Sequence, residues 1–432
     1  MSDAEIERVA AAVPANVRQV CATLTAAGHQ AVTVGGAVRD ALLEREPGDW
    51  DVATSARPEA VLALFSHTVP TGLQHGTVTV VTGRGEASHV EVTTFRGEGA
   101  YTDARRPDHV VFGVPLVEDL ARRDLRVNAM AFDPATREFH DPFRGRVDIA
   151  ERRLRAVGPT GDVYQDAVAR FTEDGLRVMR AVRFAAVLEF ELDADTERGI
   201  LPALPSLSKV SRERVSDELR KILATREPSR ALRIAQRTGI LAVIAPELAP
   251  AVEAHVATWL ARIDVAQPDA RLAAFTLELA LVGPGSARAD RKAGAEVEKL
   301  LRRLKFSNDE SALAAALAAV GSAARITTWT EPTVRRLLAD LGRARIATAI
   351  DLWRASGATA LPDIATAIAA RGDALALGDL AITGKDLMDN LGMAPGRAIG
   401  QTLTALLDRV LDEPALNTQA QLLALASAQQ QT

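Results

Sequence analysis

The sequence predicts an α+β fold, with strands and helices mixed in the first 155 residues and helices almost alone in the rest. Short runs rich in β-branched residues mark strands in the first part, as at 31–34, 78–82 and 90–95. From about residue 163 onward the pattern is helical, and proline and glycine mark the loops. The composition, rich in alanine, leucine and arginine, also favours helices.

Length and composition set outer limits on the function. A chain of 432 residues is long enough for two to four domains with their own cores. A single cysteine, Cys21, excludes an internal disulfide framework and a cysteine-based zinc site. The acidic start lacks a signal-peptide core, and no stretch is apolar enough to span a membrane, so we expect a cytoplasmic protein.

The first part of the chain alternates between helical and strand patterns. From the spacing of apolar residues we expect a helix over 5–27, a strand over 31–34, a helix over 37–44, a strand over 49–53, a helix over 58–65, and strands over 78–82 and 90–95. The following residues, 96–113, have no steady period and contain several glycines, which predicts a mobile loop. A loop of this length commonly moves with the substrate.

The stretch around the first strand contains two chemically suggestive features. Gly35 and Gly36 follow the strand and open a helix, so backbone N–H groups there can approach a phosphate. Asp49 and Asp51 are two residues apart in a predicted strand, so both carboxylates would point to the same side. Paired carboxylates of this kind can hold Mg²⁺ against a phosphate.

A second informative stretch runs from 171 to 186. If it forms one helix, with Thr172 as its N-cap, the side chains of Glu173, Asp174, Arg177 and Arg180 fall within an arc of roughly 120°. Taken alone, this pattern is also explained by a salt-bridged helix face exposed to solvent.

These stretches, taken together, resemble a known family. Gly35-Gly36, the following Val38-Arg39-Asp40 and the spaced Asp49 and Asp51 are similar to the signature of DNA-polymerase-β-type nucleotidyltransferases. More closely, the chain resembles the family of class II tRNA nucleotidyltransferases and bacterial poly(A) polymerases. Residues 119–128 resemble its Arg-Arg-Asp-Phe-Thr-Ile-Asn motif, and 173–177 its Glu-Asp-x-x-Arg motif, with Gly175 where alanine or proline is usual. The similarity covers 32–248 through several motifs and is scattered over 382–425.

The resemblance implies a role for each matching residue. It implies two Mg²⁺ ions, held for a two-metal mechanism by Asp49 and Asp51, with Glu91 as the third acid. It implies triphosphate binding by Gly36, Arg39 and Arg123, with Gly35 in support, and sugar binding by Asp124 and Asn128. It implies base selection by Asp174 and Arg177, supported by Glu173, Arg180 and Arg183. A carboxylate beside a guanidinium complements cytosine and adenine, which pair an amino donor with a ring-nitrogen acceptor, and rejects guanine and uracil.

The implied architecture is a polymerase-β-type head with a mixed sheet, followed by a helical neck, body and tail. We place them at 1–155, 156–225, 226–325 and 326–432. The implied function is template-independent addition of CMP and AMP from CTP and ATP to the 3′ end of tRNA, building CCA and releasing pyrophosphate, with the tRNA acceptor end as partner. An A-adding specialist, a bacterial poly(A) polymerase and a catalytically inactive RNA-binding relative stay open as alternatives, and the sequence does not give the oligomeric state.

Two basic clusters offer candidate contacts to RNA despite the net charge of −5. Residues 209–226 carry six lysines or arginines against three acids, and residues 288–305 carry seven against three. Either cluster can be an ordinary solvated helix face or a surface that contacts phosphates.

Overall fold

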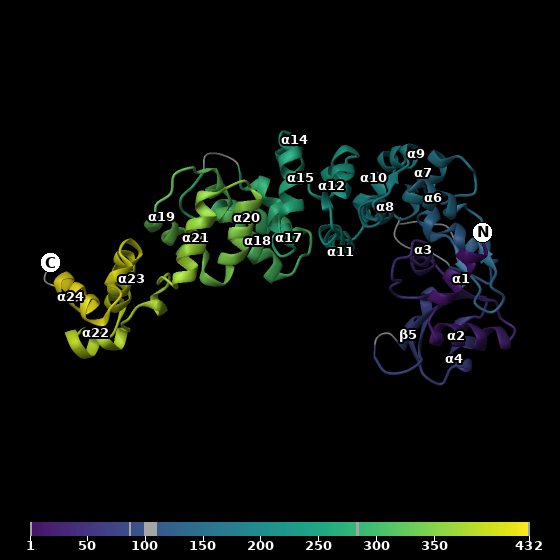
Figure 1. The fold of residues 1–432 in the computed structure, drawn as a ribbon, viewed down its shortest axis with the longest axis horizontal. Helices are drawn as coiled ribbons and strands as arrows, with labels where there is room; N and C mark the ends of the chain where they lie inside the picture. Colours follow the sequence, from purple (N-terminus) through teal and green to yellow (C-terminus); the bar gives the residue numbers. More distant parts are fainter. Residues whose placement is uncertain (1, 86–87, 99–109, 282–284, 431–432) are drawn as a thin grey trace. The chain divides into compact units, whose positions relative to one another are not determined.

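The computed structural model describes residues 2–85, 88–98, 110–281 and 285–430. The chain divides into two compact units, Met1–Thr225 with Arg230–Ile244, and Arg226–Ser229 with Ala245–Thr432 (Figure 1). The predicted head and neck lie together in the first unit.

The head is built on a mixed seven-stranded sheet, as the sequence predicts. In spatial order its strands are β3 (Thr68–Gly72), β4 (Thr77–Val81), β5 (His89–Thr94), β2 (Asp51–Thr54), β1 (Ala31–Val34), β8 (Ala131–Phe132) and β9 (Phe139–His140). Strand β2 is antiparallel to β1 and parallel to β5. In this register Asp51 lies opposite Val34, directly before the glycine pair. The first acidic residue of β2 and the glycine turn are therefore neighbours.

Two hydrophobic clusters cover the two faces of this sheet. One face packs against the helices α1 (Asp3–Ala12), α2 (Ala15–Ala26), α3 (Gly36–Leu42) and α4 (Pro58–Leu64). The other face packs around α5 (Leu116–Ala121), with Val32 and Val34 pointing into that cluster and Ala31 into the first one. This alternation follows from the period of two in a strand.

Some expected boundaries in the head are wrong. The single helix expected over 5–27 is two helices, because Pro14 has an extended backbone (φ −64°, ψ 154°) and forces Val13 out of the helical region as well. Strand β2 begins at Asp51, so Asp49 precedes the strand. Strand β3, at the edge of the sheet, was not among the predicted strands. Of the loop predicted over 96–113, residues 99–109 lie outside the described residues, and β6 (Arg96–Glu98) pairs with β7 (Val110–Phe112).

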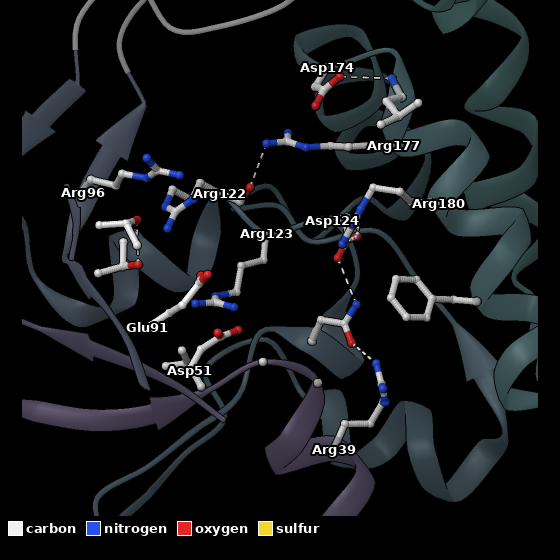
Figure 2. A pocket seen from close by; sticks show the side chains of 18 of the residues that line it. Arg39, Asp51, Glu91, Arg96, Arg122, Arg123, Asp124, Asp174, Arg177 and Arg180 are labelled. Carbon is white, nitrogen blue, oxygen red and sulfur yellow. Dashed lines mark hydrogen bonds and ion pairs between the residues drawn. The ribbon is translucent and has the colours of Figure 1, made fainter. Parts of the chain in front are cut away.

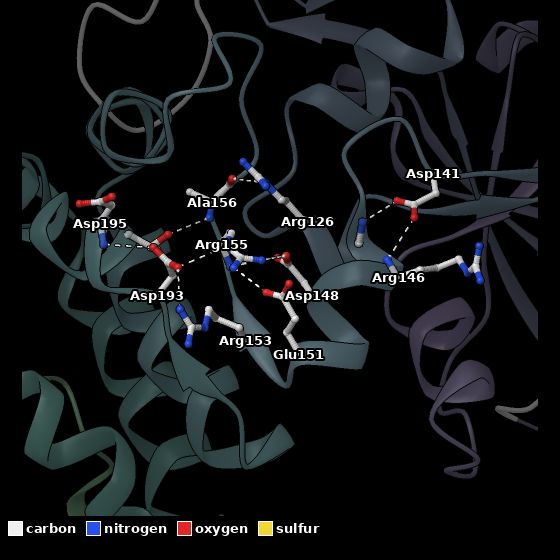
Figure 3. A network of polar contacts seen from close by, with 12 residues as sticks. Arg126, Asp141, Arg146, Asp148, Glu151, Arg153, Arg155, Ala156, Asp193 and Asp195 are labelled. Atoms are coloured by element: carbon white, nitrogen blue, oxygen red, sulfur yellow. Dashed lines mark hydrogen bonds and ion pairs between the residues drawn. The ribbon is translucent and has the colours of Figure 1, made fainter. Parts of the chain in front are cut away.

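A network of polar contacts joins the last part of the head to the first helices of the neck (Figure 3). Arg155 donates to Asp148 at 2.6 Å, to Glu151 at 2.6 Å and to Asp193 at 3.2 Å. Asp148 is fully buried on α6 (Gly145–Glu151), and Asp193 caps α9 (Ala194–Arg198). The guanidinium of Arg155 thus connects α6 to the N-terminus of α9. It lies beside the paired strands β10 (Arg153–Leu154) and β11 (Glu191–Leu192).

The rest of the first unit is helical. Its further helices are α7 (Val163–Glu173), α8 (Leu176–Leu188), α10 (Ile200–Lys209), α11 (Arg212–Leu223), α12 (Pro228–Arg237) and α13 (Ile240–Ile244). Its short 3₁₀ helices are η1 (Leu73–His75) and η3 (Arg126–Asn128).

The second unit is wholly helical where it is described. Its α-helices are α14 (Ala249–Glu253), α15 (Val256–Val265), α16 (Arg271–Thr276), α17 (Arg291–Arg303), α18 (Asn308–Gly321), α19 (Glu331–Leu341), α20 (Ile346–Ala355), α21 (Ala360–Arg371), α22 (Gly384–Leu391), α23 (Arg397–Asp412) and α24 (Gln419–Gln430). Its 3₁₀ helices are η4 (Leu277–Leu279), η5 (Ser322–Arg325), η6 (Arg343–Arg345), η7 (Leu377–Asp379) and η8 (Pro414–Leu416). Among the described residues, no helix is long and apolar enough to cross a membrane.

Candidate active site

A polar pocket of about 520 Å³ opens where the head sheet meets the helices α8 and α11 (Figure 2). Eleven of the fourteen residues predicted for the site line it: Gly35, Gly36, Arg39, Asp51, Glu91, Arg123, Asp124, Asn128, Asp174, Arg177 and Arg180. Residues more than 140 positions apart in the chain thus meet in one cavity, so the predicted motifs belong to one site.

The glycine turn forms one wall of this pocket. Gly35 has φ +80° and ψ −138°, a conformation that a residue with a side chain rarely adopts. A Cβ atom added to Gly35 would lie 3.0 Å from Nη1 of Arg123 and 4.0 Å from a carboxylate oxygen of Asp51. Both the backbone angle and the close approach therefore require glycine at position 35.

The acidic residues lie on neighbouring strands, β2 and β5. Asp51 and Glu91 line the pocket, whereas Asp49 is exposed and lies outside its lining in the described structure. Burial raises the pKa of Asp51 to about 6; Arg123 opposes this shift, and the charges of Glu91 and Asp49 add to it. The described residues contain no preformed group of three or more metal-ligating side chains. The carboxylate oxygens of Asp51 and Glu91 nevertheless suit a hard divalent cation, whose charge would offset the repulsion between them.

Arg123 is a partly exposed cation of the site that lies against its acidic wall. It lies next to Asp51 and forms a long ion pair, at 3.5 Å, with the buried Asp119. Its Nε is buried and has no hydrogen-bond partner in the described part of the chain. Burial lowers the pKa of this guanidinium. A buried donor without an acceptor is costly, so an anionic ligand that accepts from Arg123 gains affinity.

A chain of buried hydrogen bonds organises the opposite wall. Arg39 donates to Asn128 Oδ1, Asn128 Nδ2 donates to Asp124 Oδ1 at 3.0 Å, and Arg180 Nε donates to Asp124 Oδ2 at 2.8 Å. Burial favours the neutral acid, but the charge of Arg180, with hydrogen bonds from Asn128 and Arg180, holds the pKa of Asp124 well below its usual range. The guanidiniums of Arg39 and Arg180 also lie over the ring of Phe184, at 5.2 Å and 5.6 Å. Asp124 is thus a fixed anion that orients the polar groups around it.

The expectation of one helix over 171–186 is wrong. Helix α7 ends at Glu173, Asp174 is extended (φ −132°, ψ 105°), and α8 begins at Leu176. Asp174 Oδ1 accepts the Leu176 N–H at 3.0 Å and so caps the first turn of α8. The carboxylate and Arg177 therefore lie at a helix junction.

Asp174 and Arg177, the predicted base-reading pair, are each held by further contacts. Arg214 of α11 donates to Asp174 Oδ2 at 2.7 Å. Arg177 donates to Glu173 Oε2 at 2.7 Å. It also donates to the carbonyl of Arg122 at 3.0 Å (Figure 2). Glu173 thus lies behind Arg177 and outside the pocket lining that the structure describes. It orients the guanidinium.

Arg183 takes a different place from the other predicted residues. Its Nε donates to Glu218 at 2.6 Å, and its guanidinium lies 4.4 Å from the ring centre of Phe184. It is outside the described lining of the pocket, so its support of Asp174 and Arg177 stays a prediction.

The sequence reasoning missed several lining residues, among them Arg96, Arg122, Arg214, Phe184, Thr77 and Thr93. Arg96 begins β6, one residue beyond the strand that carries Glu91, and Arg122 adjoins Arg123, so their positions near predicted residues were the available signal. Arg214 belongs to the basic cluster over 209–226, but only the fold brings it to Asp174.

Comparisons with known proteins agree with this geometry. Residues 31–155 match the sequence model of the poly A polymerase head domain, 189–252 that of a probable RNA- and SrmB-binding site of polymerase A, and 291–426 that of a putative tRNA nucleotidyltransferase domain 2. The chain is 35% identical to the CCA-adding enzyme of Lactococcus lactis subsp. lactis (strain IL1403) over 397 residues, covering 92% of this chain and 93% of that protein. It is 38% identical to the CCA-adding enzyme of Geobacillus thermodenitrificans (strain NG80-2) over 390 residues, or 88% of each chain.

Solved structures lead to the same family. The crystal structure of the Bacillus stearothermophilus CCA-adding enzyme in complex with CTP matches with a TM-score of 0.72 and 32% identity over 96% of both chains. The Thermotoga maritima CCA-adding enzyme complexed with tRNA, at 16% identity and a TM-score of 0.65, shows the shared fold alone. Near-complete coverage at more than 30% identity settles the relationship: the chain belongs to the family of CCA-adding enzymes, which are class II tRNA nucleotidyltransferases.

Proposed function

We propose that this protein adds CMP and AMP from CTP and ATP to the 3′ end of tRNA, without a nucleic-acid template, to build or repair CCA. The observation that carries the proposal is that one pocket contains carboxylates suited to a metal, an arginine with a buried Nε that has no partner among the described residues, and a carboxylate–guanidinium pair at a helix junction. Together these groups supply what nucleotidyl transfer needs: a place for the triphosphate, a place for the base and a charged centre between them.

The triphosphate site is proposed at Arg123, Arg39 and the glycine turn. Arg123 lies beside Asp51 with a buried donor to offer, so it can bind a phosphate oxygen next to the reacting centre. The sugar is assigned to the side of Asp124 and Asn128. Asp124 is already engaged by Arg180 and Asn128, and we infer that it fixes the amide of Asn128 as well as facing the ribose.

Use of a divalent metal ion is general in this nucleotidyltransferase family, and we propose that the ion here is Mg²⁺. Asp51 and Glu91 would hold it, and Asp49 would join them from the segment before β2. When bound, a pair of such ions lowers the pKa of the attacking 3′-hydroxyl and stabilises the leaving pyrophosphate. The chain's own contribution is to hold Arg123 beside Asp51, where its positive charge opposes the rise in the pKa of that carboxyl.

Base choice is assigned to Asp174 and Arg177. The carboxylate can accept from the amino group of cytosine or adenine, and the guanidinium can donate to the adjacent ring nitrogen. Uracil and guanine would place a carbonyl against the carboxylate and leave buried polar groups unpaired.

The decisive experiment supplies purified protein and Mg²⁺ with tRNAs ending at the discriminator base, at C or at CC. Each tRNA is incubated with labelled CTP, labelled ATP or both. We expect two CMP residues and then one AMP. Incorporation of AMP alone would identify an A-adding specialist, a long AMP tract a poly(A) polymerase, and no incorporation on any acceptor would refute transfer altogether.

Two variants separate the metal site from the base site. Asp51→Asn should abolish transfer while CTP binding stays measurable by calorimetry. Asp174→Ala should lower the preference for CTP over UTP, because the acceptor for the amino group is lost. Asp217→Ala is the matched control, since Asp217 is an exposed carboxylate of α11 that pairs with Arg220. Unchanged CTP/UTP discrimination in Asp174→Ala would remove Asp174 from base selection.

A further inference from the structure

A second cavity, of about 700 Å³, lies in the wholly helical unit at the start of α17, and we call it the arginine hollow. Its charged walls are Arg288, Arg291, Arg345 and Asp340, and its floor includes Ala316, Ala319 and Val320 of α18. It contains part of the basic cluster over 288–305, which the proposed active site does not use.

Tight helix packing frames this hollow. A Cβ atom added to Gly294 of α17 would lie 2.8 Å from the carbonyl oxygen of Ala315, so α17 and α18 are in close contact just beyond the hollow. The hollow is open because α18 presents the small side chains of Ala316 and Ala319 to it.

The charges around the hollow are unbalanced toward positive. Arg288 binds Asp340 in a bidentate pair, at 2.7 Å and 2.9 Å, and this engages both carboxylate oxygens of the acid. Arg291 and Arg345 are exposed, and neither has an acidic partner in the described part of the chain. Arg345 uses one N–H on the carbonyl of Leu341, at 3.0 Å, which fixes its direction.

The other cations of the same cluster are accounted for differently. Arg302 pairs with Glu298 at 2.6 Å, and Arg303 pairs with Glu247 at 2.7 Å. These two arginines neutralise acids on the protein surface, as an ordinary helix face does. The excess positive charge that the sequence shows over 288–305 is therefore concentrated partly at the hollow.

We propose that the arginine hollow binds the phosphate backbone of the RNA acceptor, through residues that do not line the active-site pocket. This inference rests on the proposed function, which makes tRNA the substrate. Guanidiniums bind phosphate oxygens with paired, directed hydrogen bonds, and the chain, with a net charge of −5, attracts RNA only where cations exceed acids locally. The contact would be independent of base sequence, because the hollow offers cations and small apolar side chains.

The test compares two double variants of the full chain that remove the same charge. Arg291→Gln with Arg345→Gln empties the hollow of its two unpaired cations. Lys299→Gln with Arg302→Gln removes two cations of α17 that lie outside the described lining of the hollow. The affinity for unmodified tRNA is measured by fluorescence anisotropy at several salt concentrations, and CTP incorporation is measured at saturating tRNA.

We expect the first double variant to bind tRNA roughly tenfold more weakly, with the slope of log Kd against log salt reduced by about 2. Its kcat and its KM for CTP at saturating tRNA should match those of the wild type, and the control should bind tRNA normally. If the double variant unfolds, Arg291→Gln alone carries the test, with a reduction of the slope by about 1.

Three outcomes would overturn the proposal. The first is an unchanged affinity and salt slope, and the second is an equal loss in the control pair, which would assign the effect to general charge. The third is an unchanged affinity for tRNA together with lost thermal stabilisation by pyrophosphate, which would make the hollow a small-anion site. Failure of wild-type protein to incorporate CTP would instead count against the proposed function, since anisotropy measures binding without catalysis.

Discussion

Gly175 offers the sharpest test of the helix junction that carries the proposed base-reading pair. It lies between Asp174 and Leu176, with helical backbone angles (φ −57°, ψ −22°) that any residue can adopt. A Cβ atom there would lie 2.3 Å from both the Leu207 nitrogen and the Ser206 carbonyl carbon of α10. Because these are backbone atoms, no side-chain rotation relieves the contact.

The magnitude of Gly175→Ala follows from this geometry. Ordinary contact begins near 3.4 Å, so α8 and α10 must separate by roughly 1 Å to admit one methyl group. Overpacking of a tight contact costs about 1–3 kcal/mol, and backbone contacts place this case at the upper end. The matched control is Gly400→Ala, where an added Cβ on α23 meets nothing within 4 Å and helix propensity predicts a gain of about 0.5–1 kcal/mol.

Two measurements decide the case. Urea unfolding should show a loss of about 2–3 kcal/mol in Gly175→Ala, and kinetics with CTP and UTP should show reduced discrimination, because the residues on either side of the junction shift together. A variant as stable as the wild type that keeps its preference for CTP would refute the view that close packing of α8 on α10 fixes the base-reading pair.

Two further variants test other parts of the same unit. Gly35→Ala should lower kcat/KM for CTP by roughly a hundredfold, because the strained backbone and the tight contact with Arg123 displace the residues around the glycine turn. Circular dichroism of this variant should show retained secondary structure. Arg155→Ala should cost about 3 kcal/mol in unfolding free energy because Asp148 is left buried and unpaired, whereas Arg153→Ala, at an exposed pair, should cost under about 1 kcal/mol. Burial raises the pKa of Asp148 to about 6 against the opposing Arg155, so the deficit of Arg155→Ala should shrink as pH falls from 8 to 5 and Asp148 becomes neutral; a deficit that grows on acidification would contradict this reasoning.

The sequence was sufficient for the features that depend on local pattern. The β-branched run at 31–34, the glycine pair after it and the mixed-then-helical order are local signals, and the structure confirms each of them. The boundaries that failed depend on single residues: Pro14 divides the first helix, and Asp174, whose backbone is extended, ends α7. A periodicity that continues through such a residue does not reveal the break.

Contacts between distant segments were beyond the sequence. Arg214 reaches Asp174 across 40 positions, and Arg180 reaches Asp124 across 56. Nothing in the spacing of a basic helix indicates which of its cations will find a buried acid and which will stay at the surface. The two basic clusters illustrate this, because Arg214 lines the active site whereas Arg302 pairs with a neighbour on its own helix.

The helix break at Asp174 has a consequence for how a protein can select a base without a template. Inside a continuous helix the carboxylate would be free to change rotamer, and its direction would depend on the ligand. At the junction, one oxygen caps α8 and the other accepts from Arg214, so the acid is fixed before any nucleotide enters. Each carboxylate oxygen has two lone pairs, so Oδ2 can accept a base amino group while Arg214 stays bound. If Asp174 reads the base as proposed, selection costs little ordering of the site, and the discrimination against uracil would come from the rigidity of the acceptor as much as from its charge.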